Sequence, residues 1–261
     1  MTNPAVTGTP APASYSLPKT NAKVLALLES HLARARQVLD IGAGEGYLAR
    51  RVHDLIKSHG YAAELRACDL FPENFRVPEV PCYAIDLHGG LPLADQSVDL
   101  AYSVEVLEHL EDQFFFLREV HRVLRPGGRF VLTTPNVLSL TSRVRTLLAG
   151  FPELFGPLPI HGDDPQHVGG HIHPVSVYYI SYMAEKAGFR VIGISTDRVK
   201  SSSAALLVLW PLVKLGAAIV AMHARRNIPA IYQENREHLA RMNSFVVLTG
   251  RTVIVEMERR P

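Results

Sequence analysis

Apolar residues follow two different periods along this chain. Short, nearly continuous apolar runs indicate buried strands, and stretches with apolar residues every three or four positions indicate amphipathic helices. The two kinds of segment alternate, which predicts an α/β fold with a Rossmann-like, doubly wound, mostly parallel sheet. Strands are predicted at residues 37–41, 63–68, 82–85, 98–104, 129–134, 189–194 and 252–257. Helices are predicted at residues 21–33, 47–58, 112–124, 137–148 and 178–187.

A glycine-rich turn follows the first predicted strand, in the sequence Val38-Leu39-Asp40-Ile41-Gly42-Ala43-Gly44-Glu45-Gly46. The glycines allow a tight turn and close backbone approach before the helix that begins near Tyr47. A dinucleotide-binding turn has the spacing G-x-G-x-x-G around a pyrophosphate, and an acid directly before the turn disfavours that anion. The turn therefore predicts a pocket for a different small polar cofactor. The alternative is a helix-start turn without a ligand.

Acidic residues also follow the second and third predicted strands. Asp69 comes directly after the second strand, and Asp86-Leu87 follows the third. Ligands bind beyond the carboxyl ends of strands in such sheets. A carboxylate at Asp69 suits two ribose hydroxyls, and one at Asp86 can accept from an exocyclic amine while Leu87 covers a purine face. Each acid alone is more simply a loop carboxylate or helix cap, but acids at three successive strand ends predict a site.

The segments VLDIGAGEG, ACDL, AIDL, SVDLAYSVEVLEHLED and EVHRVLRPGGRFVLTTPN together resemble the class I S-adenosylmethionine-dependent methyltransferases. The branch resembled includes ubiquinone-biosynthesis O-methyltransferases and many sugar and lipid methyltransferases. The resemblance covers about residues 20–136 and, less distinctly, the last two strands. It implies seven strands with the last antiparallel, S-adenosylmethionine as cofactor and S-adenosylhomocysteine as product. The implied cofactor-binding residues are Asp40, Gly42, Ala43, Gly44 and Gly46 for the methionine moiety, Asp69 with Leu70 for the ribose, Asp86 and Leu87 for the adenine, and Ser103 and Glu105 on the pocket wall.

Methyl transfer needs mainly alignment of the acceptor, and a general base only where the acceptor loses a proton. His109, in Glu105-Val106-Leu107-Glu108-His109, is one candidate base; the alternative is a histidine that fixes the loop after the fourth strand. In ubiquinone-type relatives the matching Glu105, Glu108 and His109 pattern is associated with a divalent ion. Because these spacings do not separate a metal site from a polar loop network, no metal is predicted.

The segment 137–175 is longer than a simple crossover requires and is predicted to cap the cofactor. Its helix, residues 137–148, is followed by a loop rich in histidine and aspartate. The loop residues are His161, Asp163, Asp164, His167, His171 and His173. They could bond their own backbone, supply a base or bind a metal, although the spacing matches no closed zinc site. A H-x-H-P tract here resembles glycan-modifying methyltransferases, so His171 and His173 join His109 as catalytic candidates.

A second insertion spans residues 197–245. Within it, residues 204–222 carry one charge, Lys214, between basic flanks. A membrane-spanning helix needs about twenty apolar residues, but Pro211 and Lys214 weaken that interpretation. Two further alternatives are an apolar surface helix that dips into a bilayer, which the basic flanks suit, and a soluble lid or dimer face.

Composition sets broad limits on the class of protein. The 261 residues carry a net charge of +2, which argues against a nucleic-acid surface, and no amino-methylation motif follows the fourth strand. Cys68 and Cys82 cannot form a disulfide framework, so a cytoplasmic location is expected, at the inner membrane face if residues 204–222 bind lipid. Residues 1–18 are expected to be a disordered tail and residues 19–261 a single domain.

The predicted function is S-adenosylmethionine-dependent methyl transfer to a small-molecule or lipid-linked acceptor. Within this class, O-methylation of a sugar or glycan is the first prediction, and O-methylation of a quinone-like or specialised metabolite is the second. A non-catalytic regulator that binds S-adenosylmethionine and a nicotinamide enzyme are the alternatives from other classes. The two insertions are expected to form the acceptor's pocket.

Overall fold

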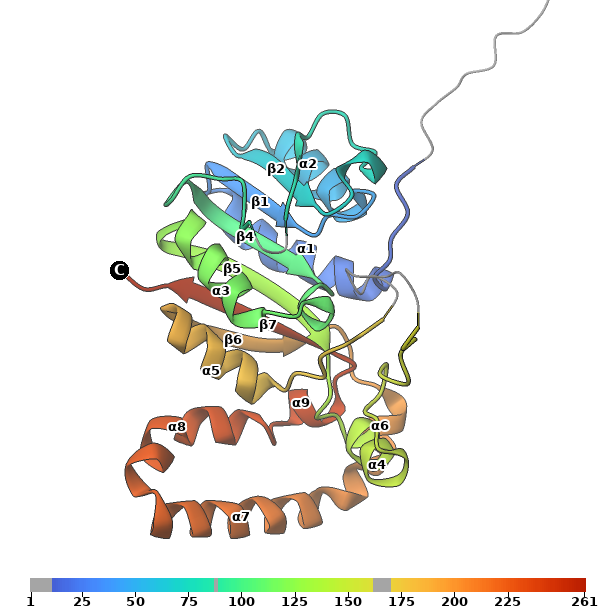
Figure 1. Cartoon of the computed structure of the whole chain (residues 1–261), viewed down its shortest axis with the longest axis vertical. Helices are drawn as coiled ribbons and strands as arrows, with labels where there is room; N and C mark the ends of the chain where they lie inside the picture. The colour runs from blue at the N-terminus through green and yellow to red at the C-terminus, as the bar shows by residue number, and fades with distance from the viewer. Residues whose placement is uncertain (1–10, 87–88, 162–169) are drawn as a thin grey trace, which may run out of the picture.

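A computed structural model describes residues 11–86, 89–161 and 170–261. This part of the chain forms a seven-stranded sheet in the order β3-β2-β1-β4-β5-β7-β6 (Figure 1). The first five strands pair in parallel, and β7 runs antiparallel to both β5 and β6. The predicted fold class is therefore confirmed, including the antiparallel last strand. The strands are β1 (Gln37–Ile41), β2 (Glu64–Asp69), β3 (Cys82–Ala84), β4 (Val98–Val104), β5 (Leu124–Pro135), β6 (Phe189–Thr196) and β7 (Thr252–Arg259).

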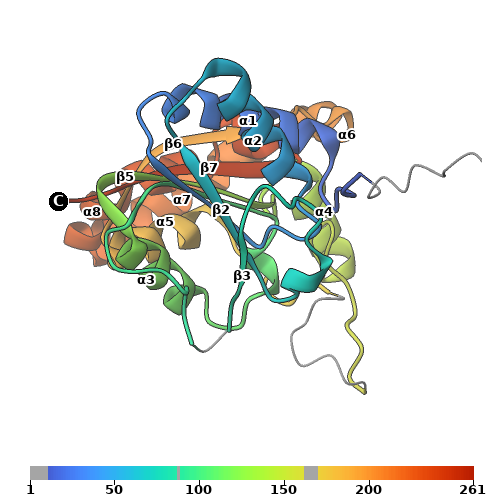
Figure 2. The same cartoon turned by 90° about the horizontal axis from the view of Figure 1, so that it is seen from above.

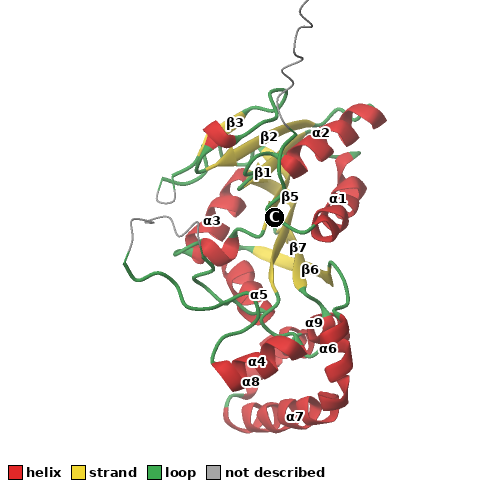
Figure 3. Cartoon of the chain, turned by 90° about the vertical axis from the view of Figure 1, so that its right-hand side faces the viewer, coloured by secondary structure: helices red, strands yellow, loops and turns green. Residues whose placement is uncertain are grey.

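Helices cover both faces of the sheet, with α1 (Pro18–Leu32) and α2 (Tyr47–His59) on one face and α3 (Gln113–Val123) and α5 (Val177–Ala187) on the other (Figures 2 and 3). Each pair buries its own core against the central strands. Val24, Leu28 and Val52 belong to the first core, and Leu117 and Ile180 to the second. A fully buried side chain of this size stabilises the fold by roughly 1.5–3 kcal/mol. These two layers hold the strand ends, and hence the site, in place.

The largest difference from the predicted boundaries is the start of β5. The Arg125-Pro126-Gly127-Gly128 segment was expected to end the preceding helix in a turn before a strand at residue 129. In the structure β5 begins at Leu124, which pairs with Val98, and the register then shifts so that Leu100 pairs with Arg129. The segment is thus an irregularity inside the strand, where proline cannot donate to the ladder and Gly127 has a φ of +76°.

The two insertions leave the sheet at the edge where β5 and β6 end, and they pack on each other. The first contains α4 (Leu140–Ala149), and the second contains α6 (Ser201–Ala205), α7 (Trp210–Asn227), α8 (Pro229–Arg241) and α9 (Phe245–Thr249). The Thr141 hydroxyl lies 2.8 Å from that of Ser203, and the Arg143 guanidinium donates to the backbone carbonyl of Met242. Figure 3 shows this helical layer below the sheet.

The N-terminal segment lies across the glycine turn. Of the predicted tail, residues 1–10 lie outside the described residues, and residues 11–17 precede α1, which begins at Pro18 rather than at residue 21. The Ala13 amide donates to Glu45 at 2.9 Å, and the Tyr15 hydroxyl donates to the same carboxylate at 3.3 Å. The Asn21 side chain donates to the Ser14 hydroxyl at 2.8 Å. These bonds bring Tyr15 and its neighbours to the carboxyl edge of the sheet.

Candidate active site

The glycine turn between β1 and α2 requires glycine at each of its three positions. Gly42, Gly44 and Gly46 have φ values of +77°, +54° and +91°, which lie in the left-handed region. A Cβ atom on Gly42 would lie 2.4 Å from Val106 Cγ2, and one on Gly46 would lie 2.6 Å from Val77 Cγ2. The turn therefore brings the backbone close to the residues that follow β4 and β2.

Two carboxylates stand at the ends of β1 and β2 beside this turn. The Asp69 carboxylate accepts from the Gly44 amide at 2.7 Å and from the Phe71 amide at 2.9 Å, so it fixes the turn to the end of β2. Asp40 is buried, and burial together with the nearby charge of Asp69 raises its pKa to about 7. Negative charge gathered here suits a cationic ligand, whereas a pyrophosphate would be repelled.

A cavity of about 460 Å³ lies beyond these strand ends. Its wall combines the glycine turn, Asp69 and Leu70 with residues that follow β4, and it also includes two residues of the N-terminal segment. The lining residues are Tyr15, Ser16, Gly42, Gly44, Asp69, Leu70, Phe71, Asn74, Ile85, Val104, Glu105, Val106, His109, Leu110 and His171. Asp40 and Ala43 line a smaller, neighbouring recess. Tyr15 and Ser16 line both this recess and the main cavity.

A second, mostly apolar cavity of about 150 Å³ adjoins the first, and the two share Ile85, Val106 and Leu110 as walls. Asp86 lines this cavity together with Phe115. A flat, apolar ring with one exocyclic amine would fit such a space. Leu87, the other residue expected to contact an adenine, lies outside the described residues.

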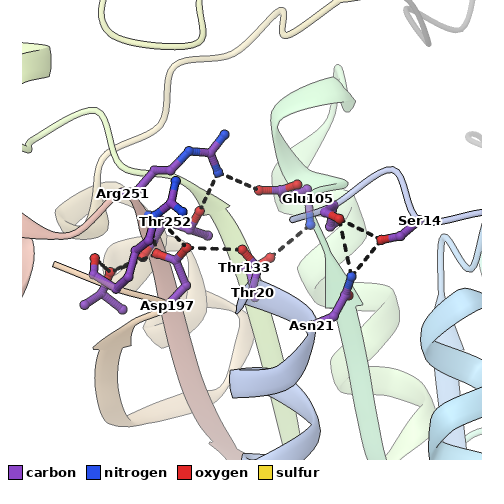
Figure 4. Close-up of polar contacts among 11 residues, drawn as sticks. Ser14, Thr20, Asn21, Glu105, Thr133, Asp197, Arg251 and Thr252 are labelled. Carbon is purple, nitrogen blue, oxygen red and sulfur yellow. Dashed lines mark hydrogen bonds and ion pairs between the residues drawn. The ribbon is translucent and has the colours of Figure 1, made fainter. Parts of the chain in front are cut away.

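Glu105 is held at the pocket wall by an unusual backbone conformation. Its φ is +54°, and its amide donates to the Thr133 hydroxyl at 3.1 Å. Its carboxylate lies 4.0 Å from the Arg251 guanidinium, and burial raises its pKa. Figure 4 shows that Thr252 links this ion pair to Asp197: the Arg251 guanidinium donates to the Thr252 hydroxyl at 3.5 Å, and the Thr252 amide donates to the Asp197 carboxylate at 3.1 Å. In the structure the segment between β6 and β7 runs from Asp197 to Arg251, beyond the predicted end of the second insertion at residue 245. Its last residue, Arg251, is tied to the pocket through Glu105.

Glu108, His109 and His171 form a cluster at the far end of the pocket. Their possible ligand atoms all lie within 4.8 Å of one another, and the two imidazole rings meet edge to face with centroids 4.9 Å apart. The Nδ1–H of His109 donates to the Gly170 carbonyl at 2.8 Å. Burial raises the pKa of Glu108 to about 8 and lowers the pKa of His171 below its usual value.

This cluster offers two kinds of chemistry. A neutral imidazole at His171 can accept a proton at neutral pH. A carboxylate and two imidazoles are also donors that a divalent cation such as zinc accepts. The group differs from the Glu105, Glu108 and His109 set implied by the family resemblance, because His171 from the first insertion takes the place of Glu105.

Three predicted site residues lie away from the pocket. Gly46 is the residue before α2 and lines none of the cavities at the strand ends. Ser103 is fully buried, and its hydroxyl donates to the Ile41 carbonyl at 2.9 Å, so it joins β4 to β1 instead of lining the cavity. The Nδ1–H of His173 donates to the Leu110 carbonyl at 2.7 Å. His173 lines a separate surface depression with Tyr179 and Tyr182. Residues 171–173 form an irregular segment.

The predicted cap contributes less to the pocket than expected. Of the described part of residues 137–175, His171 alone lines the cavity, and no described lining residue belongs to 197–245. His161 is exposed, whereas Asp163, Asp164 and His167 lie outside the described residues.

Several pocket residues escaped sequence reasoning. Tyr15 and Ser16 lie in a segment with the composition of a disordered tail. Arg251 does not line the cavity but pairs with Glu105 on its wall, and a long insertion separates it from Asp197. The positions of Asp197 after β6 and Arg251 before β7 were the available signal, since those two strands pair. Asn74 gave no such signal, because it ends a short 3-10 helix after β2, η1 (Pro72–Asn74), that has no distinctive motif.

Comparison with known proteins agrees with this site. Residues 39–132 match the methyltransferase domain family, and residues 5–68 match the family of protein-L-isoaspartate(D-aspartate) O-methyltransferase. A probable S-adenosylmethionine-dependent methyltransferase of Mycolicibacterium smegmatis is 39% identical over 122 residues, which cover 43% of each protein. The O-methyltransferase rstn1 of Aspergillus nomiae is 34% identical over 143 residues, covering 50% of this chain and 60% of that protein. The chain thus matches less than two thirds of the length of these relatives.

A solved S-adenosylmethionine-dependent methyltransferase from Archaeoglobus fulgidus shares the fold, with a TM-score of 0.54 at 17% identity, over 92% of this chain and 94% of that one. Residues 39–132 therefore match a methyltransferase domain, and the chain shares the fold of S-adenosylmethionine-dependent methyltransferases, whose cofactor is S-adenosylmethionine. The donor set fits this group, because Asp69 and Glu105 line the pocket and Asp40 lines the adjoining recess with carboxyl groups that suit its positive charges.

Proposed function

We propose that this protein methylates a hydroxyl oxygen of a sugar or lipid-linked glycan, with His171 as the general base. The observation that carries the proposal is the position of His171 on the wall of the cofactor pocket, beside His109 and with a lowered pKa. S-adenosylmethionine supplies a methyl group already activated on a sulfonium. Catalysis by the protein then depends on alignment and on removal of the hydroxyl proton.

The chain's own residues divide this work. The glycine turn with Asp40 and Asp69 holds the cofactor, and the apolar cavity around Asp86 accommodates its adenine. Glu105 adds negative charge to the part of the pocket that faces the histidines. When the acceptor oxygen takes up the methyl group that the cofactor supplies, the His171 imidazole would accept the proton that this oxygen loses. A neutral ring is needed for this step, and burial keeps His171 neutral at pH 7.

Two further observations support a hydroxylated acceptor. The pocket wall combines polar groups that can bond hydroxyls, such as Ser16 and Asn74, with the aromatic rings of Tyr15 and Phe71, which can cover the face of a sugar. A relative that matches half of this chain is named as an O-methyltransferase, and oxygen is the acceptor atom that most needs a base.

The test measures transfer of labelled methyl from S-adenosylmethionine to sugars, glycolipids and quinols. We expect a labelled sugar or glycolipid, and His171→Ala should lower kcat by about 10²-fold or more while S-adenosylhomocysteine still binds. The matched control is His173→Ala, two residues away but outside the pocket, which should stay within about twofold of the wild type.

Three outcomes contradict parts of the proposal. Full turnover by His171→Ala excludes it as the base, and labelling of quinols alone replaces the sugar as acceptor. Cofactor binding without transfer to any acceptor points to a non-catalytic protein. Loss of activity in EDTA, with recovery on added zinc or magnesium, assigns the Glu108 cluster to a metal instead of a proton acceptor.

A further inference from the structure

The helix α7 exposes an apolar stripe that nothing in the described chain covers. Leu212, Leu215, Ile219 and Met222 are three or four residues apart and so share one face, and they are 66%, 60%, 53% and 50% exposed. The half-buried positions on the opposite face are mostly small, Val213, Ala217, Ala221 and Ala224. This is the reverse of an ordinary surface helix, which turns its larger apolar residues toward the core.

The same segment stands out by hydropathy. Residues Ser201–Asn227 form the one described helical stretch long and apolar enough to cross a membrane, with a mean hydropathy of 2.1 over its best window, and none of that window is buried. Figure 1 shows α7 as the outermost element, beyond α8 and away from the sheet. A core helix of a soluble protein with this hydropathy would be covered.

The topology excludes a single membrane crossing by α7. β6 ends at Thr196 and β7 begins at Thr252, and these two strands pair in one sheet, so both ends of the insertion lie on the same side of any bilayer. A return crossing would have to use α8. That helix contains Glu234, Arg236 and Glu237, which are too costly to place in hydrocarbon. An α7 that contacts lipid therefore lies in the plane of the surface.

The charged residues of α7 indicate which kind of lipid surface it could bind. Lys214, Arg225 and Arg226 are its charged residues, and no acid occurs between residues 201 and 227. Arg225 is fixed by a 3.0 Å bond to the hydroxyl of the buried Tyr232 on α8. Basic groups next to an apolar stripe match anionic headgroups above acyl chains.

We propose that α7 docks in the headgroup region of an anionic lipid bilayer, with Leu212, Leu215, Ile219 and Met222 inserted and Arg226 on the phosphates. The binding is independent of the identity of the methyl acceptor. It places the methyltransferase domain on the membrane surface. The segment that carries α7 begins at Asp197 and ends at Arg251, which faces Glu105 on the pocket wall.

The test is co-sedimentation of the full chain with vesicles of phosphatidylcholine alone or with added phosphatidylglycerol. The wild type should bind the anionic vesicles, more weakly as salt rises. Ile219→Asp should lower the partition coefficient by about tenfold or more, and Arg226→Gln by about fivefold. The control Gln233→Asp adds the same charge on the exposed face of α8 and should bind like the wild type.

The single tryptophan, Trp210 at the start of α7, gives a second readout. Its emission should shift to the blue on anionic vesicles, and bromine placed high in the acyl chains should quench it more strongly than bromine at the bilayer centre. The exposed position of Ile219 means that Ile219→Asp should keep the wild-type unfolding midpoint and bind S-adenosylhomocysteine normally.

Sedimentation of Ile219→Asp equal to that of the wild type overturns the proposal, as does a wild type that stays in solution. A wild-type dimer that Ile219→Asp converts to a monomer, without vesicle binding, assigns the stripe to a second copy instead. Failure of methyl transfer with vesicle binding intact counts against the proposed function alone.

Discussion

Two buried carboxyl groups dominate the site at the scale of single residues. Burial raises the pKa of Asp40 to about 7 and that of Glu108 to about 8. A raised carboxyl pKa means that the folded protein binds the proton more tightly than the unfolded chain. The stabilisation is complete below the unfolded pKa values of 3.8 and 4.5 and is lost as pH rises through the folded values.

We therefore expect the free energy of unfolding of the cofactor-free protein to fall between about pH 5 and pH 8. Each carboxyl contributes a slope of up to about 1.4 kcal/mol per pH unit within its window. Urea denaturation across this range should show a flatter dependence for Asp40→Asn and for Glu108→Gln. A wild-type stability that rises with pH over the same interval contradicts the assignment.

At the scale of elements, we expect cofactor binding to depend on the glycine turn. Its backbone has left-handed φ values, and it lies against Val106, so a side chain at Gly42 would meet both obstacles. Gly42 and Gly60 have similar left-handed φ values, +77° and +64°. A Cβ on Gly42 would clash with Val106, whereas one on Gly60 would meet open space. Comparing alanine substitutions at Gly42 and Gly60 therefore separates the cost of backbone strain, which both share, from the cost of the clash with Val106, which only Gly42 has.

Gly60→Ala should cost about 1 kcal/mol in unfolding free energy, and Gly42→Ala should cost more, about 2–3 kcal/mol, and weaken S-adenosylhomocysteine binding. Chemical denaturation and calorimetric titration measure the two effects. Adding Val106→Ala to Gly42→Ala should restore part of the lost stability. Equal costs at the two glycines would show that the contact with Val106 carries no weight.

At the scale of the whole molecule, the pocket and α7 are connected through the ends of β6 and β7. Arg251 and Asp197 hold the ends of the second insertion, and Arg251 also faces Glu105 across 4.0 Å. The side chain of Asp197 is fully buried and accepts from the Thr20 hydroxyl of α1 at 3.3 Å. A substitution at Asp197 or Arg251 is therefore expected to change ligand binding in the pocket.

Arg251→Met tests this connection. The Arg251 charge lowers the pKa of Glu105, against the larger effect of burial, so its removal should raise that pKa further. Affinity for the cationic S-adenosylmethionine should then fall several-fold at pH 6 and less at pH 8, since Glu105 must be charged to attract it. Calorimetric titration at both pH values measures the effect, and an equal loss at both would point to structural damage instead.

The sequence by itself determined most of the strands and the glycine turn, because these depend on local patterns. Its motifs also carried the family resemblance that implied the cofactor. The apolar runs fix where strands form, and an acid before three alternating glycines fixes the turn at Gly42 whatever surrounds it. The carboxyl ends of parallel strands meet at one edge, so Asp40, Asp69 and Asp86 could be placed together without coordinates.

The tertiary structure alone decided which side chains reach the pocket and which surface stays open. His171 and His173 are two residues apart in an irregular segment, where no period relates spacing to direction, so only the fold shows that one lines the cavity and the other does not. Hydropathy likewise cannot separate a buried helix from an exposed one. The exposure of α7 follows from its packing against α8 and residues 206–209, which leaves the opposite face open. That packing depends on contacts across the whole insertion, whereas hydropathy depends on the local sequence.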